Sequence, residues 1–381
     1  MIESSALSKV ILPTISRQFF MMARQFDDVI DFTLGDPDIP TPKGICNAAY
    51  RASLNGGTHY APNAGLSALR AAIARYENEE SGINYSASNV AVTMGATEAI
   101  YLAFLSIVNP GDEVIILAPY WAQYENIVKM IGAKPVIINC KFDFEPNFES
   151  LKVAITPKTK VLVVNSPNNP SGHVYGESTL RELASLAINN NLIIFADEVY
   201  KGLTYGQACP SMATCCPKDR LIVFNSFSKQ FAMTGWRVGY VVACEDIIKT
   251  IVKFQQNIAV CVASPNQYAA LEALSNASRY STEIRNTFFR RREVIKSQLD
   301  KVGAIRYTLP EGAFYVFLDI SATGLDSKTF CYSLFEEEHV AAIPGVAFGD
   351  AFDHFIRLAF TVDDDKIIKG ITKINRFIIS H

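Results

Sequence analysis

The amino-acid sequence predicts an α/β fold with a mostly parallel central sheet, helices on both faces of that sheet and a smaller α+β domain. The first observation behind this prediction is a series of short, almost continuous hydrophobic runs, which are typical of strands buried on both faces. The runs expected to form strands are residues 89–94 (NVAVTM), 113–118 (EVIILA), 134–139 (KPVIIN), 160–165 (KVLVVN), 192–197 (LIIFAD), 220–225 (RLIVFN) and 239–244 (GYVVAC).

The second observation is that segments of helical length separate several of these runs. Residues 97–108 (TEAIYLAFLSIV) and 178–190 (STLRELASLAINN) are two of them. Strands that alternate with helices in this way form parallel sheets, because a helix returns the chain to the start of the next strand.

The third observation is a change of pattern after about residue 285. A long charged helix over residues 284–303 is followed by shorter strand-like and helical segments up to the end of the chain. We therefore expect a large α/β domain over residues 41–285. Residues 286–381, joined by residues 1–40, are expected to form a small α+β domain that closes over the site formed at the strand ends.

Charge and composition argue against a polyanionic partner. The 381 residues are 49% hydrophobic and carry a formal net charge of -3, with a pI of about 6.0, so we expect no nucleic-acid binding. The basic run Arg290, Arg291 and Arg292 is interpreted as a solvated helix face, with nucleic-acid contact as the weaker alternative.

Cysteine and histidine usage does not indicate a metal site. The eight cysteines contain no C-x-x-C pair and there are five histidines, so we expect no bound metal. Unpatterned cysteines fit a reducing compartment. The start MIESSALSKV lacks the apolar core of a signal peptide, and no apolar run reaches membrane-spanning length. We therefore expect a cytoplasmic protein with no membrane partner.

Ligands of open α/β sheets bind at the carboxyl ends of the strands, so the residues that follow each predicted strand are site candidates. Gly95, Ala96 and Thr97 follow the first run, and a helix begins at once. Small residues at a helix start present free N–H groups to an anion such as phosphate. The alternative is an ordinary strand-to-helix turn capped by Thr97. No G-x-G-x-x-G or Walker A sequence occurs, which argues against nicotinamide and nucleoside triphosphate chemistry.

Two further predicted strands are followed by an aromatic ring and an amide. Trp121, in PYWAQY, follows the run at 113–118. It is either a core aromatic residue or a surface on which a ring cofactor stacks. Asn169, in SPNNPSG, lies in a proline-fixed turn after the run at 160–165. The turn either only connects the strand to the next helix, or it also orients the Asn169 amide toward a ligand.

Asp197 ends a run of five apolar residues, and Tyr200 follows three residues later. A carboxylate at a desolvated strand end needs a cation or several hydrogen-bond donors. The partner is either an arginine elsewhere in the chain or a protonated nitrogen of a heterocyclic ligand.

Lys229 follows the run at 220–225 in the sequence SFSK, after the hydroxyls of Ser226 and Ser228. Phe227 and Phe231 flank it, and desolvation by aromatic rings lowers the pKa of a lysine toward that of a nucleophilic free amine. A structural lysine whose amine reaches solvent is the alternative.

Together these residues offer a phosphate seat, a stacking ring, a hydrogen-bonding amide, a carboxylate for a ring nitrogen and an amine nucleophile. All of them lie at the ends of strands of one predicted sheet. The ligand that needs all five is pyridoxal 5'-phosphate, which forms a Schiff base with a lysine and pairs its pyridinium nitrogen with an acid. We therefore predict this cofactor.

With these motifs the sequence resembles the class I/II pyridoxal-phosphate-dependent aminotransferases of fold type I, in particular their bacterial aspartate/aromatic branch. The resemblance covers nearly the whole chain, from LGDPDIPTP to FIRLAF. The segments matched in order and spacing are HYAPNAGLSALR, PGDEVIILAPYW, NSPNNPSG, DEVY and SFSKQFAMTGWRVGY. The resemblance implies the fold of a type I pyridoxal-phosphate-dependent transferase. It also implies transfer of an amino group from an L-amino acid to a 2-oxo acid.

The resemblance also implies roles for the candidate residues. Lys229 would bind the cofactor and move the proton, with Asp197 paired to the pyridine nitrogen. Asn169 and Tyr200 would bond the phenolic oxygen, and Trp121 would stack on the ring. The residues that would hold the phosphate are Ala96, Thr97, Ser226, Ser228 and Arg237.

Three further residues are implied outside these strand ends. Arg357 would bind the substrate α-carboxylate in a bidentate pair, with the backbone of Gly35 nearby. An internal salt bridge is the alternative for Arg357, because an arginine between apolar residues needs an anion. Tyr60 would reach the phosphate of the neighbouring subunit, so a homodimer with shared active sites is expected.

One departure from the family pattern bears on the substrate. The aspartate aminotransferases that this chain resembles look as though they carry a lysine where this chain has Thr97. In those enzymes the lysine helps to bind the side-chain carboxylate of the substrate. Its absence favours a donor with a neutral, sulfur-containing or aromatic side chain over strict aspartate specificity. An aspartate aminotransferase proper and a β-eliminating C–S lyase on the same fold remain alternatives. The sequence MTGWR after the lysine is closer to aminotransferases.

Overall fold

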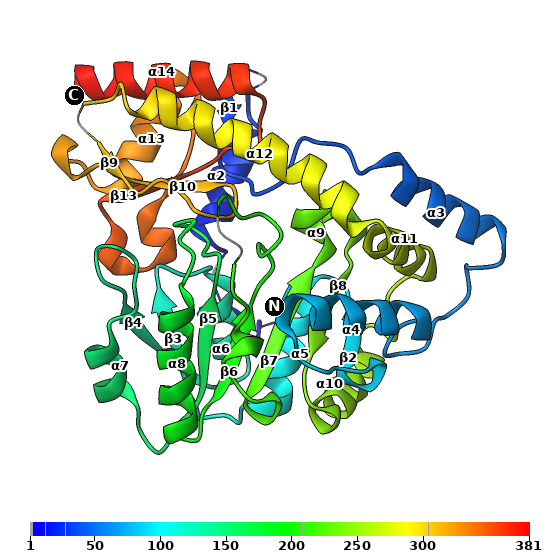
Figure 1. Ribbon diagram of the computed structural model, residues 1–381. Coiled ribbons are helices and arrows are strands. Elements are labelled where there is room, and N and C mark those ends of the chain that lie inside the picture. The colour runs from blue at the N-terminus through cyan, green and yellow to red at the C-terminus, as the bar shows by residue number, and fades with distance from the viewer. Residues whose placement is uncertain (1–2, 12, 27, 207–208, 304) are drawn as a thin grey trace.

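The computed structural model describes residues 3–11, 13–26, 28–206, 209–303 and 305–381. Within these ranges the largest sheet has seven strands, in the order β2-β8-β7-β6-β5-β3-β4 (Figure 1). The strands from β3 to β7 run parallel, whereas β8 is antiparallel to both of its neighbours. The strands are β2 (Val90–Thr93), β3 (Glu113–Ala118), β4 (Lys134–Asn139), β5 (Thr159–Asn165), β6 (Ile193–Asp197), β7 (Leu221–Ser226) and β8 (Gly239–Val242).

The predicted α/β fold with a mostly parallel sheet is confirmed, and each predicted strand lies in this sheet within two residues at either end. One detail of the prediction is wrong. The run at 134–139 was expected to be buried on both faces, but β4 is the edge strand, and both Lys134 and Asn139 are exposed. Its hydrophobic residues are mostly half-buried because an edge strand has a neighbour on one side alone.

Alternate side chains of the central strands enter two separate hydrophobic clusters. In β3, Val114 and Ile116 belong to one cluster, whereas Ile115 and Leu117 belong to the other. Successive side chains of a strand point to opposite faces, so both faces of the sheet are covered. Full burial of each aliphatic side chain contributes about 1.5–3 kcal/mol to stability.

Helices cover the two faces of the sheet. Those that contribute to the first cluster are α5 (Ala96–Ile107), α6 (Gln123–Met130) and α10 (Glu245–Ile258). Those that contribute to the second are α4 (Ser67–Ser81), α7 (Phe148–Ala154), α8 (Glu177–Asn189) and α11 (Ser264–Ser275). A further helix, α3 (Lys43–Leu54), also contributes to the second cluster and packs on α11. None of the helices in the described part of the chain is long and apolar enough to span a membrane.

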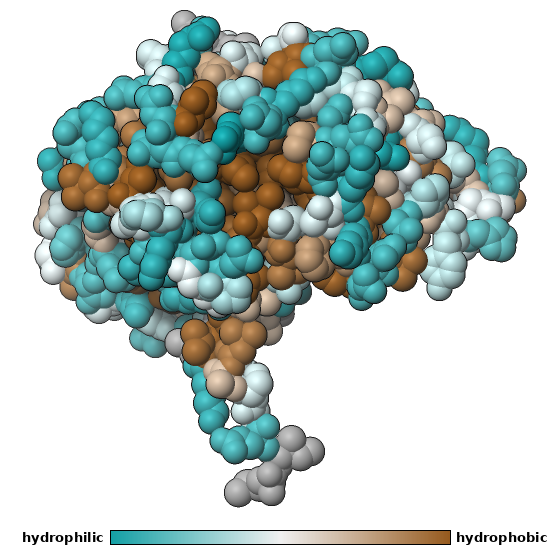
Figure 2. Space-filling model, turned by 90° about the horizontal axis from the view of Figure 1, so that it is seen from below, coloured by the Kyte–Doolittle hydropathy of each residue, from teal (hydrophilic) through white to brown (hydrophobic). Residues whose placement is uncertain are grey.

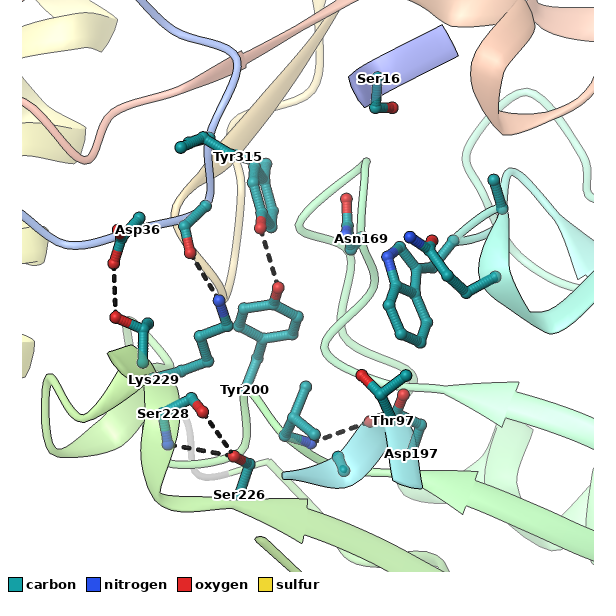
Figure 3. Close-up of a pocket in the computed structure, with 18 of the residues that line it drawn as sticks. Ser16, Asp36, Thr97, Asn169, Asp197, Tyr200, Ser226, Ser228, Lys229 and Tyr315 are labelled. Atoms are coloured by element: carbon teal, nitrogen blue, oxygen red, sulfur yellow. Dashed lines mark hydrogen bonds between the residues drawn. The ribbon is translucent and has the colours of Figure 1, made fainter. Parts of the chain in front are cut away.

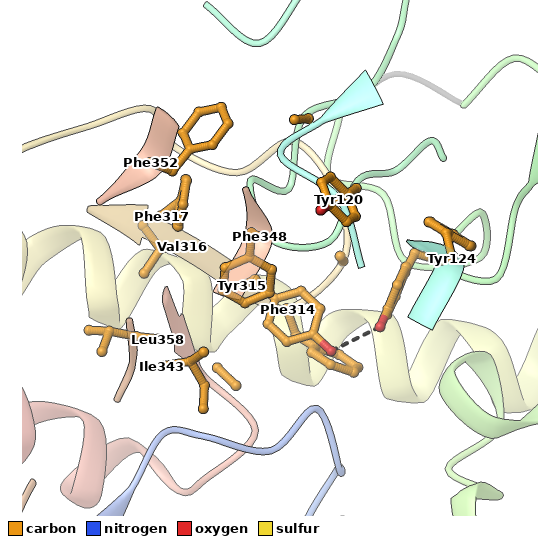
Figure 4. Packing of buried hydrophobic residues seen from close by; sticks show 14 of the residues in the cluster. Tyr120, Tyr124, Phe314, Tyr315, Val316, Phe317, Ile343, Phe348, Phe352 and Leu358 are labelled. Atoms are coloured by element: carbon orange, nitrogen blue, oxygen red, sulfur yellow. Dashed lines mark hydrogen bonds between the residues drawn. The ribbon is translucent and has the colours of Figure 1, made fainter. Parts of the chain in front are cut away.

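A second, antiparallel sheet has the order β12-β13-β10-β9. Its strands are β9 (Arg306–Tyr307), β10 (Tyr315–Asp319), β12 (Ile343–Pro344) and β13 (Phe355–Ala359), and a separate parallel pair joins β1 (Ile30–Asp31) to β11 (Val340–Ala341). The remaining helices are α1 (Ala6–Val10), α2 (Ile15–Ala23), α9 (Phe227–Gln230), α12 (Ala277–Leu299), α13 (Ser327–Glu338) and α14 (Asp364–Ser380). Figure 4 shows Tyr315 and Phe317 of β10 packed with Phe314 and Phe348.

We propose that residues 1–40 and 286–381 form the small domain and residues 41–285 the large one. The separate sheets support this division, as does the pairing of β1 with β11, which brings the N-terminal segment to the C-terminal part. The helix α12 runs without a break from Ala277 to Leu299, so it crosses the proposed boundary as one rigid element.

The basic run on α12 differs from the solvated helix face that the sequence predicted. Arg291 is buried and donates from Nη1 and Nη2 to the two carboxylate oxygens of Asp38, at 2.8 and 2.9 Å. Arg290 pairs with Asp364 at 2.9 Å, and Arg292 donates to the carbonyl oxygen of Pro310 at 2.6 Å. The run therefore ties α12 to the N-terminal segment and to α14.

A buried ion cluster lies behind the end of β6. Lys201 Nζ is 3.5 Å from a carboxylate oxygen of Glu198, 3.8 Å from one of Glu77 and 3.9 Å from one of Glu80. Tyr240 also donates to Glu77, at 2.6 Å. Burial raises the pKa of Glu198, and the Lys201 ammonium opposes that effect. Lys201 is therefore the cation that allows two buried carboxylates to approach one another.

We expect Lys201→Met to lower the free energy of unfolding by about 3–5 kcal/mol, because the change leaves Glu77 and Glu198 buried without a counter-ion. Denaturant unfolding at neutral pH measures the change. Lys249→Met is the matched control: Lys249 pairs with Glu245 and Asp246 on an exposed surface, where such pairs contribute about 0–1 kcal/mol. Equal losses in the two variants would contradict the role given to Lys201.

Candidate active site

The carboxyl ends of β2, β3, β5, β6 and β7 border one cavity of about 400 Å³. Figure 3 shows its labelled side chains pointing toward a common space from the large sheet, α2 and the segment around Tyr315. All of the predicted site residues except Tyr60 line this cavity. They are Gly35, Ala96, Thr97, Trp121, Asn169, Asp197, Tyr200, Ser226, Ser228, Lys229, Arg237 and Arg357.

Lys229 lies on the one-turn helix α9 that follows β7, and its Nζ donates a hydrogen bond of 2.5 Å to the carbonyl oxygen of Gly35. Burial, with smaller contributions from the Arg237 and Arg357 charges, lowers the pKa of Lys229 to about 8, although the Asp36 charge opposes the shift. The amine is therefore far easier to deprotonate than a surface lysine.

The aromatic residue beside Lys229 is not one of the two that the sequence indicated. Phe227 and Phe231 pack into the second hydrophobic cluster. The ring of Phe314 lies 5.6 Å from Lys229 Nζ instead. The desolvation expected from neighbours in sequence is supplied by a segment more than eighty residues away.

Asp197 is the last residue of β6 and is 4% exposed. Tyr124 donates its hydroxyl to Oδ2, and the backbone N–H of Val199 donates to Oδ1 at 3.2 Å. Burial raises the pKa of Asp197 to about 6, although both donors oppose the shift. No ion pair with Asp197 exists within the described ranges of the chain. A carboxylate held in this way fits a protonated heterocyclic nitrogen better than a structural role.

The expected phosphate seat forms where α5 meets β8. Gly95 precedes α5 with φ of 80°, so Ala96 and Thr97 occupy the first turn of the helix. A Cβ atom on Gly239 would lie 2.6 Å from the backbone nitrogen of Ala96, and one on Gly95 would lie 2.6 Å from Nη2 of Arg237. The two glycines therefore allow the helix start, β8 and the guanidinium to approach closely.

Hydroxyl groups complete this end of the cavity. Ser226 Oγ donates to Ser228 Oγ at 2.9 Å and accepts from the backbone N–H of Ser228 at 3.1 Å. Arg237 has a left-handed φ of 53°, and its Nη1 donates to the carbonyl oxygen of Thr234 at 2.9 Å. Helix N–H groups, hydroxyls and a guanidinium are the donors that a phosphate dianion requires.

Aromatic and amide groups line the middle of the cavity. Trp121 packs edge-on against Tyr124, with ring centroids 5.4 Å apart. The hydroxyls of Tyr200 and Tyr315 lie 2.9 Å apart. The Oδ1 atom of Asn169 accepts from Arg357 at 3.0 Å, which leaves its Nδ2 free to donate into the cavity.

Arg357 enters the cavity from β13 and is buried, with an exposure of 5%. Its Nη1 donates to Asn169 and its Nη2 to the carbonyl oxygen of Thr33, whereas its Nε has no partner among the described residues. The ring centroids of Tyr315 and Phe348 lie 4.5 and 5.1 Å from the guanidinium carbon. The alternative of an internal salt bridge is not found in the described part of the chain. A buried cation without a counter-ion fits an anionic ligand.

Sequence reasoning missed several residues that line the cavity. Thr14, Ser16, Arg17 and Phe20 come from α2 and its cap, and Asp36, Tyr124, Thr234 and Tyr315 also contribute. Tyr124 lies three residues after Trp121 in the motif PYWAQY, one helical turn away, and that spacing is a signal that could have identified it. The residues from α2 follow no predicted strand, so the strand-end rule could not find them.

Tyr60 lies outside the cavity, and its side chain is 87% exposed. Its segment is nevertheless held in place. Ser264 donates to the carbonyl oxygen of His59 at 2.7 Å, and Asn63 donates to that of Val260 at 2.8 Å. Within one chain, Tyr60 therefore has no contact with the site.

The buried acid without a cation, the amine of lowered pKa and the phosphate seat fit pyridoxal phosphate, so fold and site define a pyridoxal-phosphate-dependent enzyme of fold type I. The chain belongs to the aminotransferase class I and II family, whose pattern matches residues 27–374. It is accordingly an enzyme that transfers amino groups with pyridoxal 5'-phosphate as cofactor, and that part of the prediction is confirmed.

Individual relatives agree with this assignment. The chain is 37% identical over 364 residues to an aspartate aminotransferase of Pyrococcus horikoshii, covering 94% of this chain and 93% of the relative. It is 38% identical to a probable aspartate/prephenate aminotransferase of Aquifex aeolicus, covering 92% and 91%. The structure of Thermus thermophilus aspartate aminotransferase with maleate superposes with a TM-score of 0.95 at 33% identity, over 99% of this chain and all of that one.

The lowered pKa of Lys229 predicts a stability difference in the cofactor-free protein. Lys229→Met keeps the aliphatic stem but removes a charge that the folded protein disfavours below about pH 8. We expect the variant to be more stable than the wild type at pH 7 by at most about 3 kcal/mol. Because the penalty disappears as the pH rises from 8 toward the ordinary lysine pKa of 10.5, the difference should then fall below about 0.5 kcal/mol.

Thermal unfolding of the cofactor-free proteins at both pH values measures this difference. Lys253→Met, at an exposed position on α10, is the control and should leave stability unchanged at either pH. The Lys229 variant should also lack turnover when cofactor is added. A wild type as stable as the variant at pH 7 would show that Lys229 is not held at a lowered pKa.

Proposed function

We propose that the enzyme takes the amino group from an L-amino acid with a neutral, sulfur-containing or aromatic side chain, rather than from aspartate strictly, and gives it to a 2-oxo acid. The observation that carries this proposal is the composition of the cavity wall, which offers the neutral hydroxyl of Thr97 and the rings of Trp121, Phe20 and Phe348. An apolar side chain gains by burial against such rings. Thr97 carries no charge, so it cannot form an ion pair with the side-chain carboxylate of an aspartate substrate.

We propose that Arg357 binds the substrate α-carboxylate, since it is a buried guanidinium with an unpaired Nε. The cofactor, when bound, supplies an electron sink for the substrate Cα. Lys229 moves the proton released at Cα, a step that its lowered pKa favours because the neutral amine is accessible. Asp197 keeps the ring nitrogen protonated.

The remaining residues would hold the cofactor in place. Asn169 and Tyr200 would donate to its phenolic oxygen, and Trp121 would stack on its ring. Its phosphate would be bound by Ala96, Thr97, Ser226, Ser228 and Arg237. The hydrogen bonds among the serines and the close approach of Arg237 to Gly95 support this assignment.

Two alternatives differ from this proposal in the substrate or the reaction. The names of the relatives favour an aspartate aminotransferase proper. A β-eliminating C–S lyase is not favoured by any of the relatives described above. Release of pyruvate and ammonia from cysteine conjugates, without amino transfer to the cofactor, would identify the lyase.

A donor panel tests the proposed preference. Single amino acids are added to the holoenzyme without an oxo acid, and conversion of the cofactor to its amine form is followed by absorption. We expect the second-order rate constant for aromatic, sulfur-containing or neutral donors to exceed that for aspartate by at least about tenfold. Thr97→Lys should raise the constant for aspartate by roughly 10- to 100-fold through a new charged hydrogen bond.

Thr97→Met is the control, because it adds similar length without charge and should not favour aspartate. If the wild type reacts fastest with aspartate, the proposed preference is wrong and the aspartate aminotransferase alternative is correct.

We propose that the enzyme is a homodimer in which Tyr60 contacts the cofactor phosphate of the neighbouring subunit. Exposed apolar side chains near Tyr60 support this. They are Tyr50 and Leu54 on α3, Ile258 and Val260 at the end of α10, and Tyr268 on α11. α3 packs on α11, and Asn63 bonds to Val260, so these residues share one side of the protomer. The helix α1 has no buried residue, and Figure 2 shows the chain end that carries it projecting from the surface.

Mixed dimers test the shared site. Lys229→Ala and Tyr60→Ala subunits are each expected to be inactive at limiting cofactor. In a mixed dimer one site carries both changes and the other carries neither, so random mixing should restore roughly a quarter of wild-type activity. Activity after mixing and refolding is the measurement, with light scattering for the mass. No recovery from dimers of confirmed mixed composition would contradict a role for Tyr60 across the interface.

A further inference from the structure

His173 lies between two carboxylates that belong to different segments of the chain. Its Nε2 is 3.0 Å from Oε1 of Glu145, which lies between β4 and α7. Its Nδ1 is 3.3 Å from Oε2 of Glu311, which lies between β9 and β10. The imidazole is 13% exposed, and none of the three residues lines the cavity of the active site.

This arrangement favours the protonated imidazole, because a histidine ring donates from both nitrogens in its charged form alone. A neutral ring would turn the lone pair of one nitrogen toward a carboxylate oxygen. Burial lowers the pKa of His173, but its contacts with Glu311 and Glu145 raise it by more, so the pKa lies above the ordinary value of 6.5. Contact with His173 in turn lowers the pKa of Glu311, and the Arg292 charge on α12 adds to this, although burial opposes it. The Tyr175 ring packs edge-on against the imidazole, with centroids 5.4 Å apart.

Each carboxylate is also held by a second donor. Thr179 on α8 donates to Oε2 of Glu145 at 2.8 Å. The backbone N–H of Val174 donates to Oε2 of Glu311 at 3.1 Å. The positions of both acids are therefore fixed around the ring, and the imidazolium links three segments that are far apart in the sequence.

We propose that His173 is a positioning residue for substrate binding: as an imidazolium it holds together the two segments that contact Arg357, and this makes the affinity for the substrate carboxylate depend on pH. The inference rests on the proposed function above, because it takes Arg357 as the site of the α-carboxylate.

The first of these segments is the turn that carries Asn169, and it ends at His173. The backbone N–H of Asn168 donates to the carbonyl oxygen of His173 at 2.9 Å. The N–H of His173 donates to Oγ of Ser171 at 3.2 Å. Because these bonds close the turn on itself, a displacement of the imidazole is passed to the backbone around Asn169.

The second segment runs from Pro310 to Tyr315 and packs directly on this turn. The N–H groups of Glu311 and Gly312 both donate to the carbonyl oxygen of Gly172, at 3.0 and 2.9 Å. Gly172 has a φ of 71°, and a Cβ atom there would collide with Cβ of Pro310. Only glycine permits this approach. The ion pair between His173 and Glu311 joins the same two segments through their side chains.

Arg357 takes one contact from each segment. Asn169 accepts from its Nη1 at 3.0 Å, and the ring centroid of Tyr315 lies 4.5 Å from its guanidinium carbon. Figure 3 shows Asn169 and Tyr315 reaching the cavity from separate stretches of chain. When His173 loses its proton, one attraction between these stretches is lost. The guanidinium is then less firmly oriented for a bidentate pair with a carboxylate.

The test measures binding of butyrate, a non-reactive carboxylate, to the holoenzyme at constant ionic strength, followed by cofactor absorption. A raised pKa means that the contribution of His173 is complete below pH 6.5 and is lost as the pH rises through the pKa in the folded protein. His173→Asn should therefore weaken butyrate binding by roughly 3- to 10-fold at pH 6 and by less than about twofold at pH 9. Other titrating groups are common to both proteins, so the ratio of affinities isolates His173.

Two further variants accompany this comparison. His339→Asn is the matched control, because His339 also pairs with a carboxylate, that of Asp28 at 2.7 Å, but neither residue lines the cavity. It should leave the affinity unchanged at both pH values. His173→Lys keeps a positive charge throughout this range. It should bind butyrate more tightly than His173→Asn at pH 6, and at least as tightly as the wild type at pH 9.

The protonation state of His173 can be measured directly by NMR on holoenzyme with 15N-labelled histidine. One of the five histidine signals should be absent in His173→Asn and should titrate above pH 6.5 in the wild type. Glu311→Gln, which keeps the shape of the side chain but removes its charge, should lower that pKa and also weaken butyrate binding at pH 6. These two measurements decide the question even if His173→Asn does not fold.

An equal loss of affinity at pH 6 and pH 9 in His173→Asn would show that His173 is merely structural, and a pKa at or below 6.5 would also overturn the proposal. Failure of the proposed function has a different signature. Arg357→Lys should weaken butyrate binding at both pH values. Unchanged binding in that variant would refute the role given to Arg357, whereas a loss there with a pH-independent effect of His173→Asn would refute the role of His173 alone.

Discussion

The site depends on three ionisable groups that are buried away from water and lack a full set of hydrogen-bonding or oppositely charged partners. Asp197 is a buried acid with two hydrogen-bond donors, Arg357 is a buried guanidinium with an unpaired Nε, and Lys229 is an amine whose pKa burial lowers to about 8. Each arrangement costs stability in the free protein. Each also matches one part of the reaction: a ring nitrogen, a substrate carboxylate and a proton that must be taken and returned.

The large sheet provides the rigidity that holds these groups apart. β5, β6 and β7 are adjacent and parallel, and Asn165 pairs with Asp197 in the register of the first two. The residues beyond these strand ends therefore lie at fixed spacings along one edge. Behind this edge the cluster of Lys201, Glu77 and Glu198 links the residue after Asp197 to α4 and β8. The neighbouring backbone at Asp197 is thus fixed by buried ion pairs as well as by the sheet.

The sequence was sufficient for those features that depend on local order along the chain. Hydrophobic runs located the strands, and the polar residues directly after them, such as Asp197 and Lys229, lie in one cavity. It was insufficient where contacts join distant segments. Phe314 beside Lys229 and the Arg291–Asp38 pair are examples, because nothing in the sequence around either partner identifies the other. The exposed edge strand β4 was missed for the same reason, since strand order is a property of the whole sheet.

The contacts of the cavity divide recognition between two parts of the chain. The residues expected to hold the cofactor lie between Ala96 and Arg237, whereas Arg17, Gly35 and Arg357 come from the N-terminal and C-terminal segments. We therefore expect a change on α2 to leave the phosphate seat and Asp197 undisturbed. That separation matters for an aminotransferase, because one cavity must receive two different acids in turn while the cofactor stays in place.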